Sequence, residues 1–385
     1  MKHNWEYKKL GEVCEIVGGS TPKTEIADYW NGDLNWFTPA ELTNEKYYRT
    51  SERKITELAV KSTGLTLMPP GTVLLTSRAP IGKVGITTCY SYCNQGFKNL
   101  ICKENLFNEY LYYTLIFFNE EIKDKGRGAT FKEISKKVTE SISIPVPPLS
   151  VQEQIVGELD KINELIDDCR ELLRTLDNLA QSIFYDTFGD PISNPKGWEV
   201  KALKNLTIEN LSYGSGASGL PFDKKVRYIR ITDIDDSGKL KPENVVSPSV
   251  YDPKYELKDG DILFARSGAT VGKSFLYTAD IGKAIYAGYL IKATVNRSLI
   301  LPSYLYSLSK TQYYIDYIKS SVRGVAQPNV NAKLYGALSV PVPPLTLQEE
   351  FAKRIEAIEA IKATTQQQLA ALQTLLDSRM DYWFN

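Results

Sequence analysis

Residues 144–153 read Ile144-Pro-Val-Pro-Pro-Leu149-Ser-Val-Gln152-Glu153, and residues 340–349 repeat them as Val340-Pro-Val-Pro-Pro-Leu345-Thr-Leu-Gln348-Glu349. In both copies a strand-like run enters prolines, which cannot donate a ladder hydrogen bond and are expected to end the strand. A Ser or Thr followed three residues later by Glu then predicts a capping box, in which the two side chains satisfy free N–H groups at a helix start. The repeat therefore predicts two long helices, each following one globular half.

Shorter matches connect the two halves at a nearly constant spacing along the chain. They pair Trp5-Glu6 with Trp198-Glu199, Tyr110-Leu-Tyr112 with Tyr304-Leu-Tyr306, Arg127-Gly128 with Arg323-Gly324, and Arg78…Gly82-Lys83 with Arg266…Gly272-Lys273. The segment Gly18-Gly-Ser-Thr-Pro22 has no close copy in the second half. A duplicated scaffold with divergent loops is suited to reading two different targets with two similar modules. The alternative is a duplication that serves stability alone.

Each half combines short strands with helices. Alternation and turn residues predict strands near 72–76, 84–88 and 97–102 in the first half and near 261–264, 274–277 and 289–295 in the second. The residues Leu111, Leu115, Phe118 and Ile122 fall on one helical face, and a counterpart helix is expected from Pro302 to about residue 321. A last strand is expected near 141–146 and near 337–342. Because strands and helices do not alternate regularly, the sequence predicts two α+β domains.

The helix that follows Ser150 carries a heptad seam, the pattern of a coiled coil. The predicted seam comprises Ile155, Leu159, Ile162, Ile166, Cys169, Leu173, Leu176, Ala180 and Ile183, and in the second helix Phe351, Ile355, Ile358, Leu369, Leu372 and Leu376. Lys362 and Thr365 interrupt the second seam, which indicates register control, a docking place for a partner or a weaker stretch. Because a whole domain separates the helices, we expect them to pair antiparallel.

The predicted boundaries are a first globular domain over 1–149, a helix over 150–189, a second globular domain over 190–345 and a second helix over 346–385. The overall formal charge is zero, but it is unevenly distributed. The domains carry 19 basic and 17 acidic side chains over 1–149 and 20 against 14 over 190–345, whereas the helices carry 3 against 9 and 4 against 6. Mildly basic domains permit a phosphate-binding face without demonstrating one.

Composition narrows the class of protein. Apolar residues make up 43% of the chain, enough to bury real cores. The N-terminal residues lack the apolar region of a signal peptide, and the longest apolar stretch, residues 110–118, is too short to span a membrane, so we expect a soluble cytoplasmic protein. Five cysteines in such a chain favour free thiols over a disulfide framework. With His3 as the only histidine, the cysteines favour buried or edge-strand thiols over a metal site.

Catalytic motifs are not recognised in the sequence. The segment from Ser267 to Ser274 resembles a phosphate loop, but only three residues separate Gly268 from Gly272, where that loop needs four. The chemistry that remains is that of recognition, because Arg and Lys neutralise phosphates while Arg, Asn and Gln can contact base edges. The candidate DNA-binding residues are Ser77, Arg78, Lys83, Arg127, Thr130 and Lys132 in the first half, and Arg266, Ser267, Thr270, Lys273, Arg323, Gln327 and Asn329 in the second.

These motifs resemble the specificity subunit of type I restriction–modification enzymes. The resemblance covers the whole chain and includes both Pro-Pro-Leu-x-x-Gln-Glu helix starts, Gly18-Gly-Ser-Thr-Pro22, Phe188-Gly-Asp-Pro191…Gly197-Trp198, and Arg323-Gly…Gln327-Pro-Asn. It departs where Phe131-Lys-Glu-Ile134 stands in place of Gln327-Pro-Asn-Val330, which puts equal DNA-contact roles for Phe131 and Gln327 in doubt.

The resemblance implies that each half is a target recognition domain for one part of a bipartite double-stranded DNA site. It implies that the antiparallel helices set the spacer and that two modification subunits dock on them, with restriction subunits added. S-adenosylmethionine, ATP and Mg would then be bound by those partner subunits and no cofactor by this chain, which would be non-catalytic. Two alternatives remain open: a coiled-coil scaffold with two protein-binding modules and no DNA contact, and an autonomous enzyme such as a nuclease.

Overall fold

A computed structural model describes residues 3–43, 45–78, 80–126, 133–235, 237–322 and 329–385. The chain divides into two compact units. The first comprises Met1–Arg170 together with Gln367–Asn385, and the second comprises Glu171–Gln366. Each unit therefore contains one globular half and parts of both long helices. Within the described ranges, no helix combines the length and the apolar composition that a bilayer span requires.

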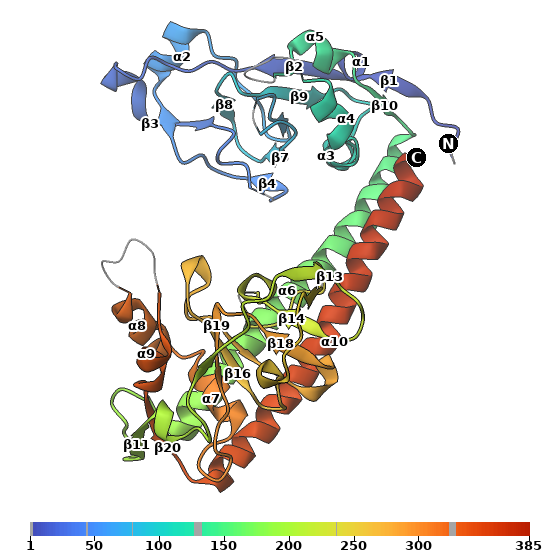
Figure 1. The fold of residues 1–385 in the computed structure, drawn as a ribbon. Coiled ribbons are helices and arrows are strands. Elements are labelled where there is room, and N and C mark those ends of the chain that lie inside the picture. Colours follow the sequence, from blue (N-terminus) through green and yellow to red (C-terminus); the bar gives the residue numbers. More distant parts are fainter. Residues whose placement is uncertain (1–2, 44, 79, 127–132, 236, 323–328) are drawn as a thin grey trace. The chain divides into compact units, whose positions relative to one another are not determined.

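The first globular half is a mixture of short strands and short helices followed by one long helix (Figure 1). Its strands are β1 (Tyr7–Lys9), β2 (Cys14–Gly18), β3 (Trp30–Phe37), β4 (Tyr47–Tyr48), β5 (Lys54–Ile55), β6 (Val73–Leu75), β7 (Val84–Thr87), β8 (Ser91–Cys93), β9 (Lys98–Cys102) and β10 (Ser143–Pro145). Its helices are α1 (Leu10–Val13), α2 (Glu57–Thr63), α3 (Asn108–Phe117), α4 (Asn119–Asp124), α5 (Lys136–Glu140) and the long α6 (Leu149–Phe188).

The second half also combines short strands and short helices with one long helix at its end. Its strands are β11 (Glu199–Ala202), β12 (Ser212–Tyr213), β13 (Gly219–Pro221), β14 (Arg227–Ile229), β15 (Val246–Pro248), β16 (Ile262–Ala265), β17 (Ser274–Leu276), β18 (Ala284–Tyr286), β19 (Leu290–Ala293) and β20 (Ser339–Val342). Its helices are α7 (Pro302–Leu308), α8 (Gln312–Ser321), α9 (Ala332–Gly336) and the long α10 (Leu345–Phe384).

The two halves share one sheet topology. The order β2-β9-β6-β7 in the first half corresponds to β12-β19-β16-β17 in the second, and both runs are antiparallel. The ribbon β1-β10 corresponds to β11-β20, and the parallel pair β3-β8 corresponds to β14-β18. The halves differ at their margins, where β4 extends the first sheet and β13-β15 forms a separate ribbon in the second. The duplication therefore extends to the core of the fold.

Most predicted strands are confirmed within one or two residues, because each combines a buried apolar run with flanking turn residues. The predicted helices after them are interrupted. In the first half Phe118 lies between α3 and α4, and in the second Thr311 begins a new helix, α8, where its side chain accepts a hydrogen bond from the Tyr314 backbone N–H. The prediction of one continuous helix from Pro302 to residue 321 was therefore wrong, because this segment forms two helices, α7 and α8. In the first half, Leu111, Leu115 and Ile122 are buried as predicted.

The long helices begin one residue before the predicted position, at Leu149 and Leu345. The carbonyl of Pro148 accepts from the backbone N–H of Gln152, and that of Pro344 accepts from Gln348. Ser150 and Thr346 therefore lie inside the first turn, so the predicted capping boxes are wrong. Instead, a proline carbonyl accepts the first hydrogen bond of each helix. Proline can do this because it lacks the backbone N–H but keeps its carbonyl oxygen as an acceptor.

The glutamine of the repeated motif has a structural role that its spacing did not reveal. The Gln152 side chain is fully buried, accepts from the Phe107 backbone N–H (2.8 Å) and donates to the carbonyls of Asn105 (3.1 Å) and Pro147 (2.8 Å). Gln348 repeats the pattern: it accepts from the Leu301 N–H (2.8 Å) and donates to the carbonyls of Leu299 (3.2 Å) and Pro343 (2.8 Å). Each amide joins the start of a long helix to the loop before the domain helix, α3 or α7.

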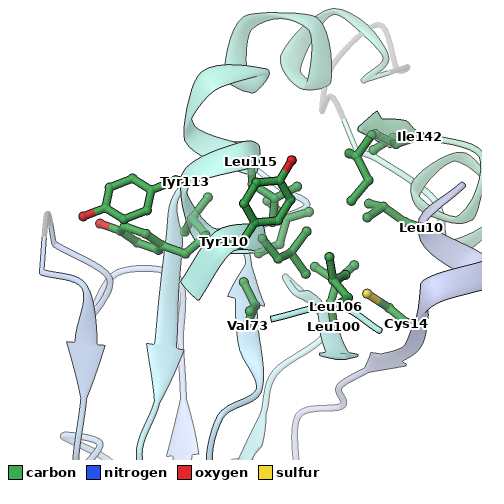
Figure 2. Close-up of a cluster of buried hydrophobic side chains, with 14 of the residues drawn as sticks. Leu10, Cys14, Val73, Leu100, Leu106, Tyr110, Tyr113, Leu115 and Ile142 are labelled. Carbon is green, nitrogen blue, oxygen red and sulfur yellow. The ribbon is translucent and has the colours of Figure 1, made fainter. Parts of the chain in front are cut away.

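The end of each long helix packs against a globular half. In the first unit Phe384 of α10 contacts the buried Tyr110 ring, with centroids 5.6 Å apart, and joins the cluster that Figure 2 shows around Tyr110 and Leu115. In the second unit Phe184 and Phe188 of α6 contact Tyr304, at 5.7 and 4.8 Å. Aromatic contacts of this kind are worth about 0.5–1.5 kcal/mol each beyond area burial.

The long helices run antiparallel to each other in both units. In the first unit Glu158 of α6 pairs with Arg379 of α10 and accepts from the Trp383 ring N–H (3.0 Å). In the second unit Asp177 of α6 pairs with Lys362 of α10 (2.7 Å). The predicted pairing is thus confirmed. The predicted seam is buried at Ile155, Leu159, Ile162, Ile166, Leu176, Phe351 and Ile358 and partly buried at Cys169, Leu173, Ala180, Ile183, Ile355, Leu369, Leu372 and Leu376.

The two polar residues that interrupt the second seam are themselves buried. Lys362 is 7% exposed and Thr365 is 2% exposed. The Lys362 ammonium group binds Asp177 (2.7 Å) and Glu359 (2.8 Å), and Lys239 of the domain binds the same Glu359 (2.9 Å). Among the readings of this interruption, the contacts favour register control, because a buried polar layer penalises any shift that leaves it unpaired.

All five cysteines are free thiols. Cys14 of β2 lies opposite Cys102 of β9 in the sheet, and Cys93 at the end of β8 is buried. Burial raises the pKa of the Cys93 thiol to about 12, so this thiol stays protonated at neutral pH. Such thiols behave as small apolar side chains.

Replacing the buried glutamine should weaken the link between helix and domain. We expect Gln152→Ala to lower the free energy of unfolding by about 2–4 kcal/mol, because it leaves one backbone N–H and two carbonyls without their partner. Gln154→Ala, at an exposed position on the same helix, should change it by less than about 0.5 kcal/mol. Urea denaturation checks both values. Equal stability of the two variants would contradict this role of Gln152.

The polar layer should make stability depend on pH. Burial alone disfavours the Glu359 carboxylate, but the hydrogen bonds from Lys362 and Lys239 outweigh it and hold the pKa of Glu359 below its ordinary 4.5. A depressed carboxyl pKa stabilises the folded state above the unfolded pKa, and this stability is lost as pH falls through the folded value.

We therefore expect Lys362→Met to lose less stability than the parent chain between about pH 5 and pH 3, because its Glu359 has lost one cation. The exposed Lys353→Met is the matched control on the same helix and should follow the parent. Denaturation across this pH range measures the difference. Parallel pH profiles of parent and Lys362→Met would show that the layer contributes no pH-dependent stability.

Candidate nucleic-acid interface

Most of the candidate residues that the structure describes lie on equivalent loops of the two halves. In the first half two backbone hydrogen bonds close the loop from β6 to β7. The Thr76 N–H donates to the Lys83 carbonyl (3.0 Å), and the Gly82 N–H donates to the Thr76 carbonyl (3.0 Å). The second half has the same two bonds: the Ala265 N–H donates to the Lys273 carbonyl (2.8 Å), and the Gly272 N–H donates to the Ala265 carbonyl (2.9 Å). Gly82 and Gly272 both have φ near +90° (89° and 86°), a conformation that favours glycine and explains why the loops keep it.

The backbone ladder corrects the predicted pairing of arginines by one position. The N–H of Ser77 donates to Gly96 (2.7 Å) and its carbonyl accepts from Ile134 (2.9 Å). Arg266 makes the equivalent bonds, donating to the Tyr289 carbonyl (3.0 Å) and accepting from Val330 (2.8 Å). Arg266 therefore occupies the place of Ser77, and Ser267 the place of Arg78. The repeated motif suggested otherwise because the second loop is one residue longer before Gly272.

The second half presents an arginine at this place. The guanidinium of Arg266 lies over the Tyr213 ring, 4.7 Å from its centroid, and its Nε donates to the Asn329 side-chain oxygen (3.3 Å). The Tyr213 hydroxyl in turn accepts from the backbone N–H of Ala332 (3.1 Å). A stacked guanidinium loses little entropy when it forms further hydrogen bonds. Arg266, with the exposed Asn329 beside it, therefore offers an ordered set of donors and acceptors at the surface.

The first half places different chemistry on the same loop. Ser77 is buried, and its hydroxyl accepts from Lys98 (3.3 Å). Arg78 is exposed and pairs with Glu133 (3.0 Å), which also binds Lys98 (3.4 Å). Partial burial opposes ionisation of Glu133, but the hydrogen bond from Arg78 and the charge of Lys98 outweigh it and lower its pKa. Arg78 and Glu133 thus form an exposed ion pair where the second half has Ser267 and Asn329.

Several candidate residues make contacts that hold the loops. The Lys83 ammonium group donates to the Leu42 carbonyl (2.5 Å), and the Thr270 hydroxyl donates to the Ser267 carbonyl (3.1 Å). Ser267 and Lys273 are half-buried at the ends of the same loop. The candidates Arg127, Thr130, Lys132, Arg323 and Gln327, together with Phe131, lie outside the described residues. The DNA contacts of all the candidates remain predictions.

A glycine–serine turn beside these loops was missed in the second half. The Ser20 N–H donates to the Cys93 carbonyl (3.1 Å), and the Ser215 N–H donates to Tyr286 (2.8 Å). A Cβ on the preceding Gly19 or Gly214 would lie 2.1–2.4 Å from carbonyl oxygens of the opposite segment, so only glycine fits. The Gly18-Gly-Ser segment therefore does have a counterpart, Gly214-Ser215. The signal was the short Gly-Ser pair, which the surrounding divergence concealed.

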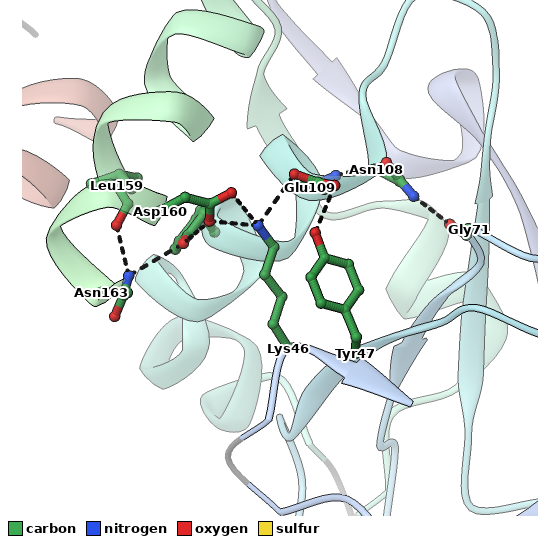
Figure 3. A network of polar contacts seen from close by, with 9 residues as sticks. Lys46, Tyr47, Gly71, Asn108, Glu109, Leu159, Asp160 and Asn163 are labelled. Carbon is green, nitrogen blue, oxygen red and sulfur yellow. Dashed lines mark hydrogen bonds and ion pairs between the residues drawn. The ribbon is translucent and has the colours of Figure 1, made fainter. Parts of the chain in front are cut away.

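A lysine network between domain and helix was also missed. Lys46 binds both carboxylate oxygens of Asp160 on α6 (2.5 and 2.8 Å) and Glu109 on α3 (3.2 Å), as Figure 3 shows. Tyr47 donates to Glu109 (2.7 Å), and Tyr113 donates to Asp160. Burial and these carboxylate acceptors raise the pKa values of both tyrosines, which stay neutral donors. No short motif marks this network, because its members are far apart in sequence.

The described side chains on the two equivalent loops are suited to binding a partner through hydrogen bonds and charge. Among the residues that the structure describes, no group of His, Cys, Asp or Glu is placed to hold a metal ion. In the second half, Arg266 contacts the Asn329 amide and the Tyr213 ring. In the first half, Arg78 forms an ion pair with Glu133.

Comparisons with known proteins agree with the duplicated fold. The sequence matches the family described as "Type I restriction modification DNA specificity domain" over residues 2–176 and again over 195–374. It is 28% identical to the type I restriction enzyme MjaIX specificity subunit of Methanocaldococcus jannaschii, across 97% of this chain and 91% of that protein. It is 31% identical to the EcoR124I/EcoR124II specificity subunit of Escherichia coli, across 43% of each chain.

A solved structure has the same fold. The S subunit of a type I restriction–modification system from M. genitalium superposes with a TM-score of 0.61 over 99% of this chain and 96% of that chain, at 15% identity. The two family matches coincide with the two halves that share one sheet topology. The chain belongs to the family of type I restriction–modification specificity subunits, and as such it contributes two DNA-recognition domains and no catalysis of its own.

Proposed function

We propose that each globular half reads one part of a bipartite site in double-stranded DNA and that the paired helices set the spacer between the two parts. The observation that carries this proposal is the change of chemistry on equivalent loops. The same backbone positions hold Ser77 in one half and the tyrosine-stacked Arg266 in the other. Two domains that recognise different base sequences need the same loop backbone with different side chains on it.

The chain acts within a type I complex, so its partners include DNA and the modification and restriction subunits. We infer the finer composition: two modification subunits dock on the helices, and restriction subunits join them. Under this proposal S-adenosylmethionine, ATP and Mg are bound by those partners, and this chain binds no cofactor. The complex would act in the cytoplasm, where its DNA is. The acidic composition of the helices supports protein docking there, because negative charge repels the DNA backbone.

Methylation mapping tests the modular reading. In cells that contain the modification subunit, deletion of this gene should abolish methylation at one asymmetric bipartite adenine motif. Exchange of residues 1–149 for those of a relative with another specificity should change one half of the motif and keep the other half and the spacer. A chimera that changed both halves, or a deletion that left the methylated motif intact, would refute the proposal.

A single arginine should carry part of the specificity of the second half. We expect Arg266→Ala to weaken discrimination at one base position by about 1–3 kcal/mol if its guanidinium contacts a base edge. The exposed Arg297→Ala, which removes an ion pair with Asp259, is the matched control and should leave the motif unchanged. The methylation map of each variant is the measurement. An unaltered motif in Arg266→Ala would show that Arg266 reads no base.

A further inference from the structure

The first half holds an exposed arginine that lies outside the two equivalent loops. Arg53 directly precedes strand β5. Its guanidinium lies over the Trp30 ring, 3.8 Å from the ring centroid, and is 5.3 Å from the centroid of Trp36. Among the residues that the structure describes, no carboxylate forms an ion pair with it. An aromatic surface therefore holds Arg53 in place while its N–H donors stay available to a partner.

The two tryptophans that support Arg53 are themselves fixed. Both belong to strand β3, and their rings lie edge to face with centroids 5.2 Å apart. The Trp30 ring N–H donates to the Lys23 carbonyl (3.2 Å), and the Trp36 ring N–H donates to the Ser20 carbonyl (3.0 Å). Because neither ring can turn without losing its hydrogen bond, the guanidinium above them keeps one position.

The aromatic support lies beside the glycine–serine turn in both halves. In the first half Trp36 donates to that turn, at Ser20. In the second half Tyr213 directly precedes the equivalent turn, Gly214-Ser215, and supports the Arg266 guanidinium. Each half thus has one arginine over an aromatic ring next to the same turn. The two arginines come from different elements of the fold, so no repeat in the sequence connects them.

The loop between β6 and β7 supplies no unpaired arginine in the first half. The place of Arg266 is taken there by the buried Ser77, and the neighbouring Arg78 is paired with Glu133 (3.0 Å). A guanidinium that is bound to a carboxylate must give up this ion pair before it contacts a base. Arg53 has no such competitor among the described residues, which makes it the better suited arginine of this half.

We propose that Arg53 is a DNA-contacting residue of the first half and that its guanidinium reads a guanine. This inference rests on the proposed function, since it takes the first half as the reader of one part of the DNA site. Arginine binds the O6 and N7 atoms of guanine through two hydrogen bonds, the commonest specific contact in the major groove. The indole support fixes the guanidinium before DNA binds, so less entropy is lost when these bonds form.

Mapping the methylated motif tests whether Arg53 reads a base. We expect Arg53→Ala to relax discrimination at one guanine, in the part that the first half reads, by about tenfold or more. The other part and the spacer should stay unchanged, which also shows that the complex is folded and assembled. Arg49→Ala is the matched control and should give the parent's motif. Arg49 is an exposed arginine of the same segment, and no aromatic ring among the described residues supports it.

A modified base separates a base contact from a phosphate contact. The duplex carries the parent's motif with 7-deazaguanine at that guanine, which removes the N7 acceptor and keeps the base pair. The parent chain in complex with the modification subunits should bind this duplex about tenfold more weakly than the unmodified one, whereas the Arg53→Ala complex should bind both equally. A parent that binds both duplexes equally, with Arg53→Ala weakened on both, would show a phosphate contact and overturn the inference.

Failure of this inference differs from failure of the proposed function. If Arg53→Ala gives the parent's motif while exchange of residues 1–149 changes one part of it, the inference is overturned and the proposed function stands. If that exchange changes neither part, the first half reads no DNA and the proposed function itself fails. A guanine that is relaxed equally in Arg49→Ala would make general positive charge responsible and would also overturn the assignment to Arg53.

Discussion

The buried amides of Gln152 and Gln348 hold each long helix to the domain from which it emerges. Each side chain accepts one backbone N–H and donates to two carbonyls in full burial, so an error in the helix position would leave several polar groups unpaired. Burying an unpaired polar group costs about 1–3 kcal/mol. Each amide therefore ties the first turn of its long helix to the loop before the domain helix. The prolines beside it contribute carbonyls alone, which suits an acceptor role at a helix start.

The far end of each helix is anchored by apolar contacts. Phe384 of α10 packs on Tyr110 in the first unit, and Phe188 of α6 packs on Tyr304 in the second. Each globular core is thus completed by the tail of the helix that follows the other half. Area burial tolerates sliding, whereas the buried Lys362 with Asp177 and Glu359 does not, because displaced charges would lose their partners. Apolar ends supply stability, and the polar layer supplies register.

The two halves carry different side chains on loops whose backbones are held in the same way. The loops that carry Ser77 and Arg266 have the same hydrogen bonds and the same glycine at positive φ, yet different side chains. A rigid loop lets a side chain change without moving its neighbours, which is the condition for evolving a new recognition surface.

The sequence alone determined the duplication, the strands of the common sheet, the antiparallel helix pair and the family, since all of these are expressed in repeats and in the spacing of apolar residues. Only the tertiary structure decided that Arg266 matches Ser77, that Gly214-Ser215 repeats the first glycine turn, and that Gln152 bonds the loop before α3 while no capping box forms. It also brought Lys46 to Asp160. The physical reason is that these features depend on hydrogen bonds and ion pairs between residues distant in the chain, and their energies are set by burial and geometry.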